Sequence, residues 1–382
     1  MKIKIIKQIS LFSIVALLAS QCLGLSLPFP QYEPGHLFSS HEIKNFSLSA
    51  PLSTLFRARL LNVMAARKVA VKGTLSYQEH GRAIKIPVEL KLKPTTSMAS
   101  CKFPSVEIKF TGSTQRTVFE GTKFIDLNTH CAEALDVSVA LFHRIAFFNH
   151  REALIYQMME TLEMPTLHAR AAFLQYEDTD TNRDVSFNPR LMYQAFFLED
   201  MAEFRKRNRV TEVKAESDFL RASVEQDERD REALFTFRAV SETPQIETED
   251  LARTVVFEFL VGNQDWFIRK TPPDTFIVNR KTANSLVNMK MFERPDGRQI
   301  LIPSGFTVAT FATGEDELPP LNRAAFELAT ESERKKVLQL FLRKRTEILN
   351  LVVLKNDEMI EIMRKTINSA FDQLEKELQK LK

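Results

Sequence analysis

Glycine is scarce in this chain, with 10 residues among 382, and tryptophan occurs once. The sequence contains neither a Gly-x-Gly-x-x-Gly pattern nor a Walker pattern, so it lacks the usual glycine-rich loops that cradle phosphates. Phenylalanine is abundant instead, with 30 residues. The composition therefore argues against a glycine-rich phosphate loop and suits a core packed from aromatic side chains.

An excess of charge of either sign is also missing. The 52 lysine and arginine residues nearly balance the 49 aspartate and glutamate residues, which leaves a net charge of +3. This balance gives no electrostatic footprint for nucleic acid, although local patches remain open. With 44% hydrophobic and 26% charged residues, the chain is not disordered, and its length predicts one large domain with an appendage.

Apolar runs long enough to span a bilayer are absent, so we expect no transmembrane segment in the mature chain. The N-terminus instead has the order of a secretory signal: lysines come first, then a short apolar run over residues 9–18, then small or neutral residues to Gly24. We expect a signal peptide over 1–24, an extended leader over 25–54, and export to the periplasm or the extracellular space. Cys22 leaves a lipoprotein as the alternative, although Gln21 is a poor fit to the small residue expected at a lipidation site.

Cysteine is rare as well, and removal of the signal would leave Cys101 and Cys131. In an oxidising compartment two remaining cysteines favour one disulfide, which would close a loop of roughly 30 residues and add on the order of 3 kcal/mol. Two buried free thiols are the alternative.

Alternating apolar and polar residues predict an antiparallel sheet with one solvated face. A hairpin is expected from Val69 to Leu92, turning near Gly81, and a further strand over 106–110. Helical spacing follows over 135–164. Near the C-terminus a capping box at Thr330 and Glu333 opens a helix, and an apolar stripe over 360–381 marks another. That stripe either docks onto the domain or forms a coiled-coil homodimer.

The most informative stretch is Leu260–Trp266, where an apolar helix ends at Gly262 and Asn263 before Asp265 and the single tryptophan. By itself the glycine could be an ordinary left-handed helix stop. The loop resembles the Gly-Asn-x-Asp-Trp loop of the CotH-type (spore-coat protein H) atypical kinases, specifically their secreted bacterial relatives. The resemblance extends over roughly residues 55 to 315 and includes Cys101-Lys102-Phe103-Pro104 and Glu152-Ala153-Leu154-Ile155-Tyr156.

The resemblance implies an α+β fold, with an antiparallel-sheet N-lobe and a helical C-lobe of the atypical protein-kinase type. The CotH-kinase-like domain would cover 55–315, and a C-terminal helical extension would cover 316–382. By the same resemblance Asp265 would be the catalytic base, and Asn288 a group on the metal side. Glu152 would pair with the nucleotide lysine, and Asn263 belongs to the same candidate nucleotide site.

Three sites depart from the family pattern. Lys93-Pro94 stands where Arg-Gly is expected, and Asp126 takes the place of the phosphate-binding lysine. Gly305 and Thr307 occupy the two positions whose aspartates would hold magnesium. These losses predict a degenerate nucleotide and metal site.

We therefore expect a secreted, pseudokinase-like binding or scaffold module of the cell envelope, without a cofactor, whose partner is an envelope or secreted protein. The alternative is an active secreted kinase, or another phosphoryl or nucleotidyl transferase, that uses Asp265 as base with ATP and magnesium. A third interpretation is that the fold is wholly structural.

Two further patterns are weak metal signals, and we predict no metal site from them. His143 and His150 lie a heptad apart without a third ligand. The stretch 178–184 begins like a calcium loop, but Arg183 stands where glycine is required and Pro189 replaces the bidentate glutamate. A solvated turn is the better interpretation.

Overall fold

The structure is a computed structural model of the chain. It describes residues 37–61, 63–66, 68–93, 103–129, 148–181, 190–212, 233–237, 247–263, 268–271, 275–280, 289–306, 309–314, 317–352 and 360–381. The predicted signal peptide, the cysteines Cys22, Cys101 and Cys131, and the residues His143, Asp265, Asn288 and Thr307 lie outside these ranges.

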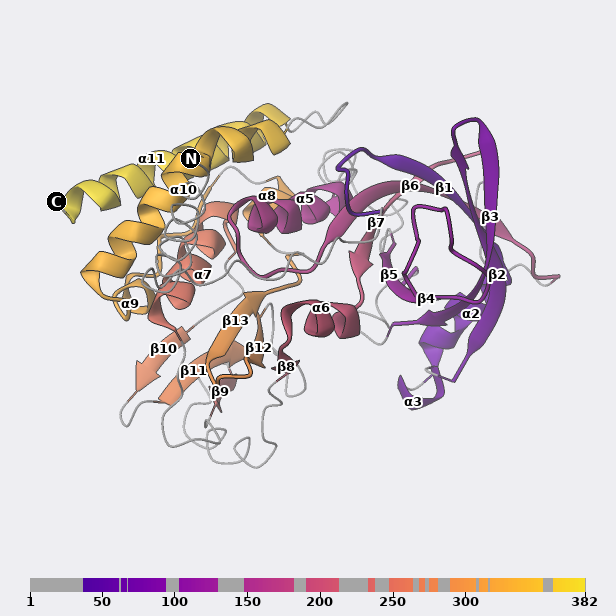
Figure 1. Cartoon of the computed structure of the whole chain (residues 1–382), viewed down its shortest axis with the longest axis horizontal. Helices are drawn as coiled ribbons and strands as arrows, with labels where there is room; N and C mark the ends of the chain where they lie inside the picture. The colour runs from indigo at the N-terminus through magenta and orange to yellow at the C-terminus, as the bar shows by residue number, and fades with distance from the viewer. Residues whose placement is uncertain are drawn as a thin grey trace, which may run out of the picture. The chain divides into compact units, whose positions relative to one another are not determined.

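Seven strands close into a barrel in the order β1-β2-β3-β4-β5-β7-β6 (Figure 1). Their bounds are β1 Lys44–Ala50, β2 Ala70–Glu79, β3 Arg82–Leu92, β4 Val106–Phe110, β5 Phe124–Asn128, β6 Ala169–Asp178 and β7 Tyr193–Glu199. Along β3 the residues from Ile86 to Leu92 alternate between a buried and a more exposed side, as the sequence pattern predicts for a strand with one face in a core. The hairpin expected over 69–92 is confirmed as β2 and β3.

Aromatic rings fill the inside of the barrel. The ring of Phe46 lies 4.9 Å from that of Phe197 and 5.8 Å from that of Phe119, centroid to centroid, and all three side chains are buried. Tyr77 closes the group, and its hydroxyl accepts a hydrogen bond from the backbone N–H of Val118 at 3.0 Å. The abundance of phenylalanine is thus used in part to pack this core.

The predicted fold class is wrong. The sequence led us to expect the sheet N-lobe and helical C-lobe of an atypical kinase, whereas the structure has a closed seven-stranded barrel followed by a mixed α and β part. The barrel closes through β1, which pairs antiparallel with β2 and parallel with β6. Lys44 and Ala172 are partners across the parallel pair, so closure depends on a contact between distant segments that local periodicity does not reveal. The stretch expected to be an extended leader supplies this strand.

A short helical segment follows β1: α2 Leu52–Arg57, the 3₁₀ helix Ala58–Leu60, and α3 Val63–Ala66. The carboxylate of Asp178, at the end of β6, accepts hydrogen bonds from the backbone N–H of Leu52 at 2.9 Å and from the hydroxyl of Ser53 at 2.5 Å. Asp180 accepts from the backbone N–H of Thr54 at 2.6 Å. The first two aspartates of the calcium-like stretch therefore satisfy the free N–H groups that begin a helix.

The rest of the chain combines helices with two small sheets. The helices are α5 Phe148–Thr161, α6 Met201–Asn208, α7 Thr248–Val261, α8 Thr310–Thr313 and α9 Arg323–Phe326. One sheet has the order β13-β12-β8, with β8 Thr211–Glu212, β12 Met289–Glu293 and β13 Gln299–Pro303. The other has the order β10-β11-β9, with β9 Ala233–Phe237, β10 Ile268–Thr271 and β11 Thr275–Arg280. The helix expected before Gly262 is confirmed as α7.

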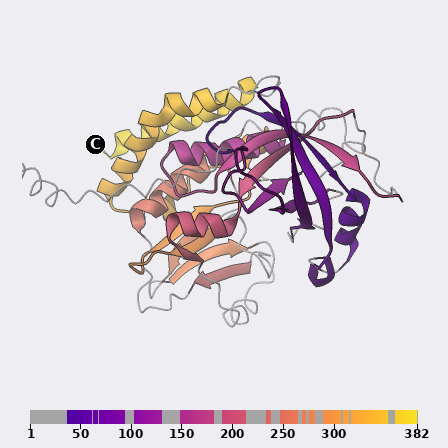
Figure 2. The same ribbon diagram turned by 45° about the vertical axis from the view of Figure 1, so that its right-hand side comes forward.

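Two long helices, α10 Glu331–Leu351 and α11 Ile360–Lys380, run side by side near the C-terminus (Figures 1 and 2). The predicted capping box is present, because the Thr330 hydroxyl and the Glu333 carboxylate each bond the other's backbone N–H. The apolar stripe of α11, including Met363, Ile367 and Phe371, is buried in the core shared with α7 and α10. This stripe is therefore used within the chain. Within the described ranges no helix is both long and apolar enough to cross a membrane.

Candidate functional site

The sequence-predicted site residues that the structure describes fall into two groups. Asp126 on β5 and Lys93, just after β3, form an ion pair. Glu152 and Asn263 belong to a buried polar row that runs between α5 and the end of α7. Asp265 and Asn288 lie outside the described residues.

The first group is an ion pair. The ammonium group of Lys93 contacts the carboxylate of Asp126, whose side chain is only 3% exposed. In the register of β4 and β5, Asp126 is the partner of Glu107, so a second carboxylate stands on the neighbouring strand. A buried carboxylate is costly unless it is paired, and Lys93 supplies the opposite charge.

Further charges surround Lys93. The pKa of Lys93 is lowered to about 8, mainly by burial and then by the positive charge of Lys290 on β12, while the negative charges of Asp200 and Glu107 act in the opposite direction. Asp200 begins α6, where its carboxylate accepts the N–H of Ala202 at 2.8 Å. Two lysines thus lie among three carboxylates, and we call these five residues the mixed-charge cluster. It holds no excess positive charge for a phosphate group.

The second group begins at Glu152. Its carboxyl oxygen accepts a hydrogen bond from the backbone N–H of Phe306 at 3.2 Å. Burial raises the pKa of Glu152 to about 7, and this hydrogen bond offsets only part of the rise. None of the ion pairs within the described ranges includes Glu152. The residue that the family resemblance would pair with a nucleotide lysine is instead bonded to the main chain.

Tyr156 lies one helical turn further along α5 and holds the neighbouring peptide. Its hydroxyl accepts a hydrogen bond from the backbone N–H of Gly305 at 3.1 Å, and its ring packs against that of Phe306 with centroids 5.3 Å apart. The negative charges of Glu152 and Glu258 both raise the pKa of Tyr156, after burial as the largest cause. Tyr156 is therefore close enough to both carboxyl groups to interact with them electrostatically.

Glu258 is the most deeply buried acid of this row. It lies on α7 with an exposed fraction of 0%, and burial raises its pKa well above the usual glutamate value. The carboxamide of Asn263 approaches it and opposes that rise, without the geometry of a full hydrogen bond. The row Glu152, Tyr156, Glu258 and Asn263 therefore joins α5 to the loop that follows α7.

Gly262 ends α7 in a left-handed conformation, with φ of 67°. A Cβ atom added there would lie 2.5 Å from Cβ of Thr310, and the N–H of Thr310 donates to the Gly262 carbonyl at 3.0 Å. Only glycine fits both the backbone conformation and this close approach. The start of the Asp265 loop is thus fixed against α8.

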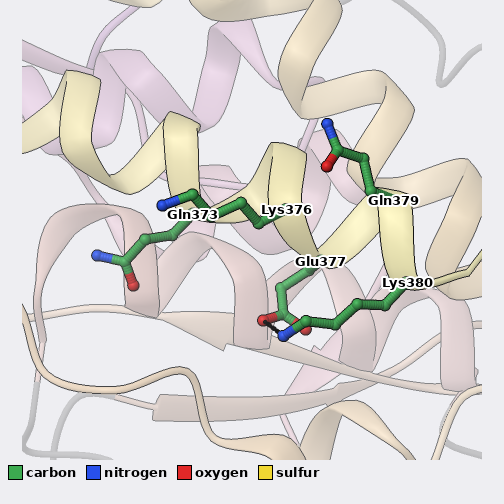
Figure 3. Close-up of a pocket in the computed structure, with 5 residues that line it drawn as sticks. All are labelled: Gln373, Lys376, Glu377, Gln379 and Lys380. Atoms are coloured by element: carbon green, nitrogen blue, oxygen red, sulfur yellow. Dashed lines mark hydrogen bonds and ion pairs between the residues drawn. The ribbon is translucent and has the colours of Figure 1, made fainter.

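The structure also has a surface hollow of about 530 Å³ lined by residues of α11: Gln373, Lys376, Glu377, Gln379 and Lys380 (Figure 3). Glu377 pairs with Lys380 at 2.9 Å and with Arg323 at 2.6 Å. Because its lining comes from one polar helix face and its single carboxylate, Glu377, is paired with Arg323 and Lys380, this hollow has no catalytic constellation. The chemistry-bearing residues of the resemblance lie elsewhere.

Sequence reasoning missed the partners that define both groups. Glu258 had a readable signal, since it is a lone carboxylate within the apolar run Val255–Val261. Lys290 had none, because its place beside Lys93 depends on how β12 packs. Among the described residues no three His, Cys, Asp or Glu side chains are arranged to hold a metal ion. No protein-family model matches the chain, and the comparison with curated proteins found no match.

Proposed function

We propose that this protein is an exported binding or scaffold module that does not transfer phosphoryl groups. The observation that carries the proposal is the ion pair between Lys93 and Asp126. Binding a nucleoside triphosphate requires lysine or arginine side chains whose positive charge is free to face the phosphates. Here the lysine is paired within the chain, and two more carboxylates act on it.

The buried row supports the same proposal. Glu152 serves the backbone of Phe306 and has no lysine partner in the described part of the chain. The segment at Gly305 carries no carboxylate among its described residues from Gln299 to Phe306. Magnesium at a phosphate site normally needs one or two carboxylates in addition to phosphate oxygens. The described residues therefore supply structural contacts where catalysis would need ligands.

Export and partner type rest on the sequence. The lysine-rich start, the short apolar run and the neutral stretch to Gly24 have the order of a secretory signal. We propose an envelope or secreted protein as partner for that reason. A distant relationship to the CotH-type kinases is proposed on the sequence motifs alone, and it does not extend to the kinase-like fold that the closed barrel overturns.

The direct test is phosphoryl transfer by the mature protein. We expect no transfer from labelled ATP to the protein itself or to added envelope proteins, with magnesium or with manganese. The matched control is Asp265→Asn. Transfer by the wild type that Asp265→Asn abolishes, with little change in the melting temperature, would overturn the proposal and establish Asp265 as the base.

A further inference from the structure

The contact between α5 and the segment Gly305-Phe306 is built from one titratable carboxyl group and one hydroxyl. Glu152 receives the N–H of Phe306 at 3.2 Å, and Tyr156 receives the N–H of Gly305 at 3.1 Å. The ring of Phe306 is fully buried and lies 5.9 Å from that of Phe257 on α7. The segment is therefore clamped between α5 and α7, with two backbone N–H groups held by side chains.

This segment is connected to the loop after α7. The N–H of Ala309 donates to the Phe306 carbonyl at 3.1 Å, and the next residue, Thr310, donates its N–H to the Gly262 carbonyl at 3.0 Å. Arg151, beside Glu152 on α5, reaches the carbonyl of Ala312 in α8 at 3.4 Å. A movement of Phe306 away from α5 would therefore disturb the hydrogen bonds that join this segment to α8 and to Gly262.

We propose that Glu152 is a proton-sensitive latch, whose neutral carboxyl group holds Phe306 against α5 and whose ionisation releases this segment together with its contact to Gly262. The inference does not depend on the proposed function. It concerns a conformational device, and it holds for a binding module and for an enzyme alike.

Two effects of ionisation oppose each other at Glu152. A carboxylate accepts the Phe306 N–H more strongly than a neutral carboxyl group does. It also places a negative charge in a buried position that has no cation partner among the described residues. The second effect wins, because the buried Glu152 side chain has a single hydrogen-bond donor and no cation partner among the described residues, and the rise of its pKa to about 7 has the same direction. Opening lets water reach the carboxylate and removes this penalty.

The other titratable groups around the latch do not compensate the charge. The described groups near α5 include Glu258 on α7, Arg170 on β6, the Glu199–Arg207 pair at β7, and Lys344 of α10 near Glu163; on α5 itself they include His150, Arg151, Tyr156 and Glu160, which pairs with His168. Burial raises the pKa of Glu258, which favours its neutral form, and a glutamate supplies no positive charge in either form. Arg151 points to the Ala312 carbonyl, and none of these cations contributes to the pKa of Glu152.

The test is hydrogen exchange of the full chain between pH 5.5 and 8.5, read in peptides that cover 304–314 and corrected for the intrinsic pH dependence of exchange. If the open state has an ordinary glutamate pKa of 4.5, the opening equilibrium should increase about 30-fold over this range and level off above pH 7. Peptides from α10 are the internal control and should not change. In Glu152→Gln the side chain at position 152 stays uncharged, so the protection of peptides covering 304–314 should vary less than about twofold over this pH range.

Two variants separate the latch from its neighbours. Tyr156→Phe removes the acceptor of the Gly305 N–H and should lower protection at every pH while the pH step remains. Glu258→Gln should leave the step in place; loss of the step in Glu258→Gln but not in Glu152→Gln would overturn the proposal. Should Glu152→Gln fail to fold, the wild type still decides, because unchanged protection of 304–314 from pH 5.5 to 8.5 contradicts the latch.

Discussion

The ammonium group of Lys93, one residue beyond β3, pairs with the carboxylate of Asp126 in the middle of β5. The two side chains differ in exposure, since that of Lys93 is 37% exposed and that of Asp126 only 3%. Loss of Lys93 would therefore leave a buried carboxylate without its cation, whereas loss of Asp126 would leave a partly exposed lysine without its anion.

Lys93→Met should cost more stability than Asp126→Asn at pH 7. The first variant leaves a buried carboxylate without its cation, for which we expect a loss of about 1–3 kcal/mol in the free energy of unfolding. The second leaves a lysine that can turn towards water, and we expect a loss below about 1 kcal/mol. Urea unfolding of both variants measures the difference, and equal losses would show that Asp126 does not depend on Lys93.

Glu258→Gln should stabilise the protein at pH 8 and have little effect near pH 4.5. The folded-state pKa of Glu258 is raised, so its contribution to stability is present below the unfolded value of 4.5 and is lost as pH rises through the folded value. Glutamine stays neutral and avoids that loss, by about 1–3 kcal/mol at pH 8 if the burial cost is typical. Unfolding curves at the two pH values test this, and a destabilised variant at pH 8 would refute it.

Gly262→Ala should destabilise the protein more than Gly297→Ala. Both glycines have positive φ, 67° and 81°, so alanine is strained at either position. At Gly297 nothing lies within 4 Å of the added Cβ, whereas at Gly262 it would meet Thr310 at 2.5 Å. We expect an additional loss of about 1–3 kcal/mol at Gly262 from overpacking. Similar melting temperatures for the two variants would contradict the close packing of the loop on α8.

Asp178→Ala should lower stability by about 1–3 kcal/mol, and calcium should not raise the melting temperature of the wild type. The carboxylate of Asp178 accepts from the N–H of Leu52 and from the Ser53 hydroxyl, and its side chain is buried. Asp180, which caps Thr54 in a more exposed position, is the matched site, and Asp180→Ala should cost less. A calcium-dependent rise that Asp178→Ala removes would restore the calcium-loop interpretation.

Local features of this fold could be predicted from the sequence, and long-range ones could not. The alternation of β2 and β3, the left-handed stop at Gly262 and the capping box at Thr330 are set by neighbouring residues. Closure of the barrel depends on β1 pairing with β6 more than a hundred residues away, and β1 lies within the stretch 25–54 that we expect from the sequence to be an extended leader. The kinase-like architecture was inferred from motifs, which do not determine strand closure.

The candidate site divides in the same way. Sequence reasoning placed a carboxylate at Asp126 where a phosphate lysine was expected, but Lys93 became its partner only through the register of β3, β4 and β5. Likewise, Glu152 was recognised as part of a motif, whereas its bond to the Phe306 N–H joins segments about 150 residues apart. Charge complementarity between such segments has no signal in a single sequence.

The most direct test of the central claim is a thermal-shift titration of the mature wild type and of Lys93→Met with ATP, with and without magnesium or manganese. A nucleotide bound with Kd of about 10 μM would add about 2.7 kcal/mol at 1 mM and raise the melting temperature clearly. The account predicts no shift for either protein, because the charge of Lys93 is already paired with Asp126. A metal-dependent shift in the wild type that Lys93→Met abolishes would contradict it and would make Lys93 a phosphate ligand.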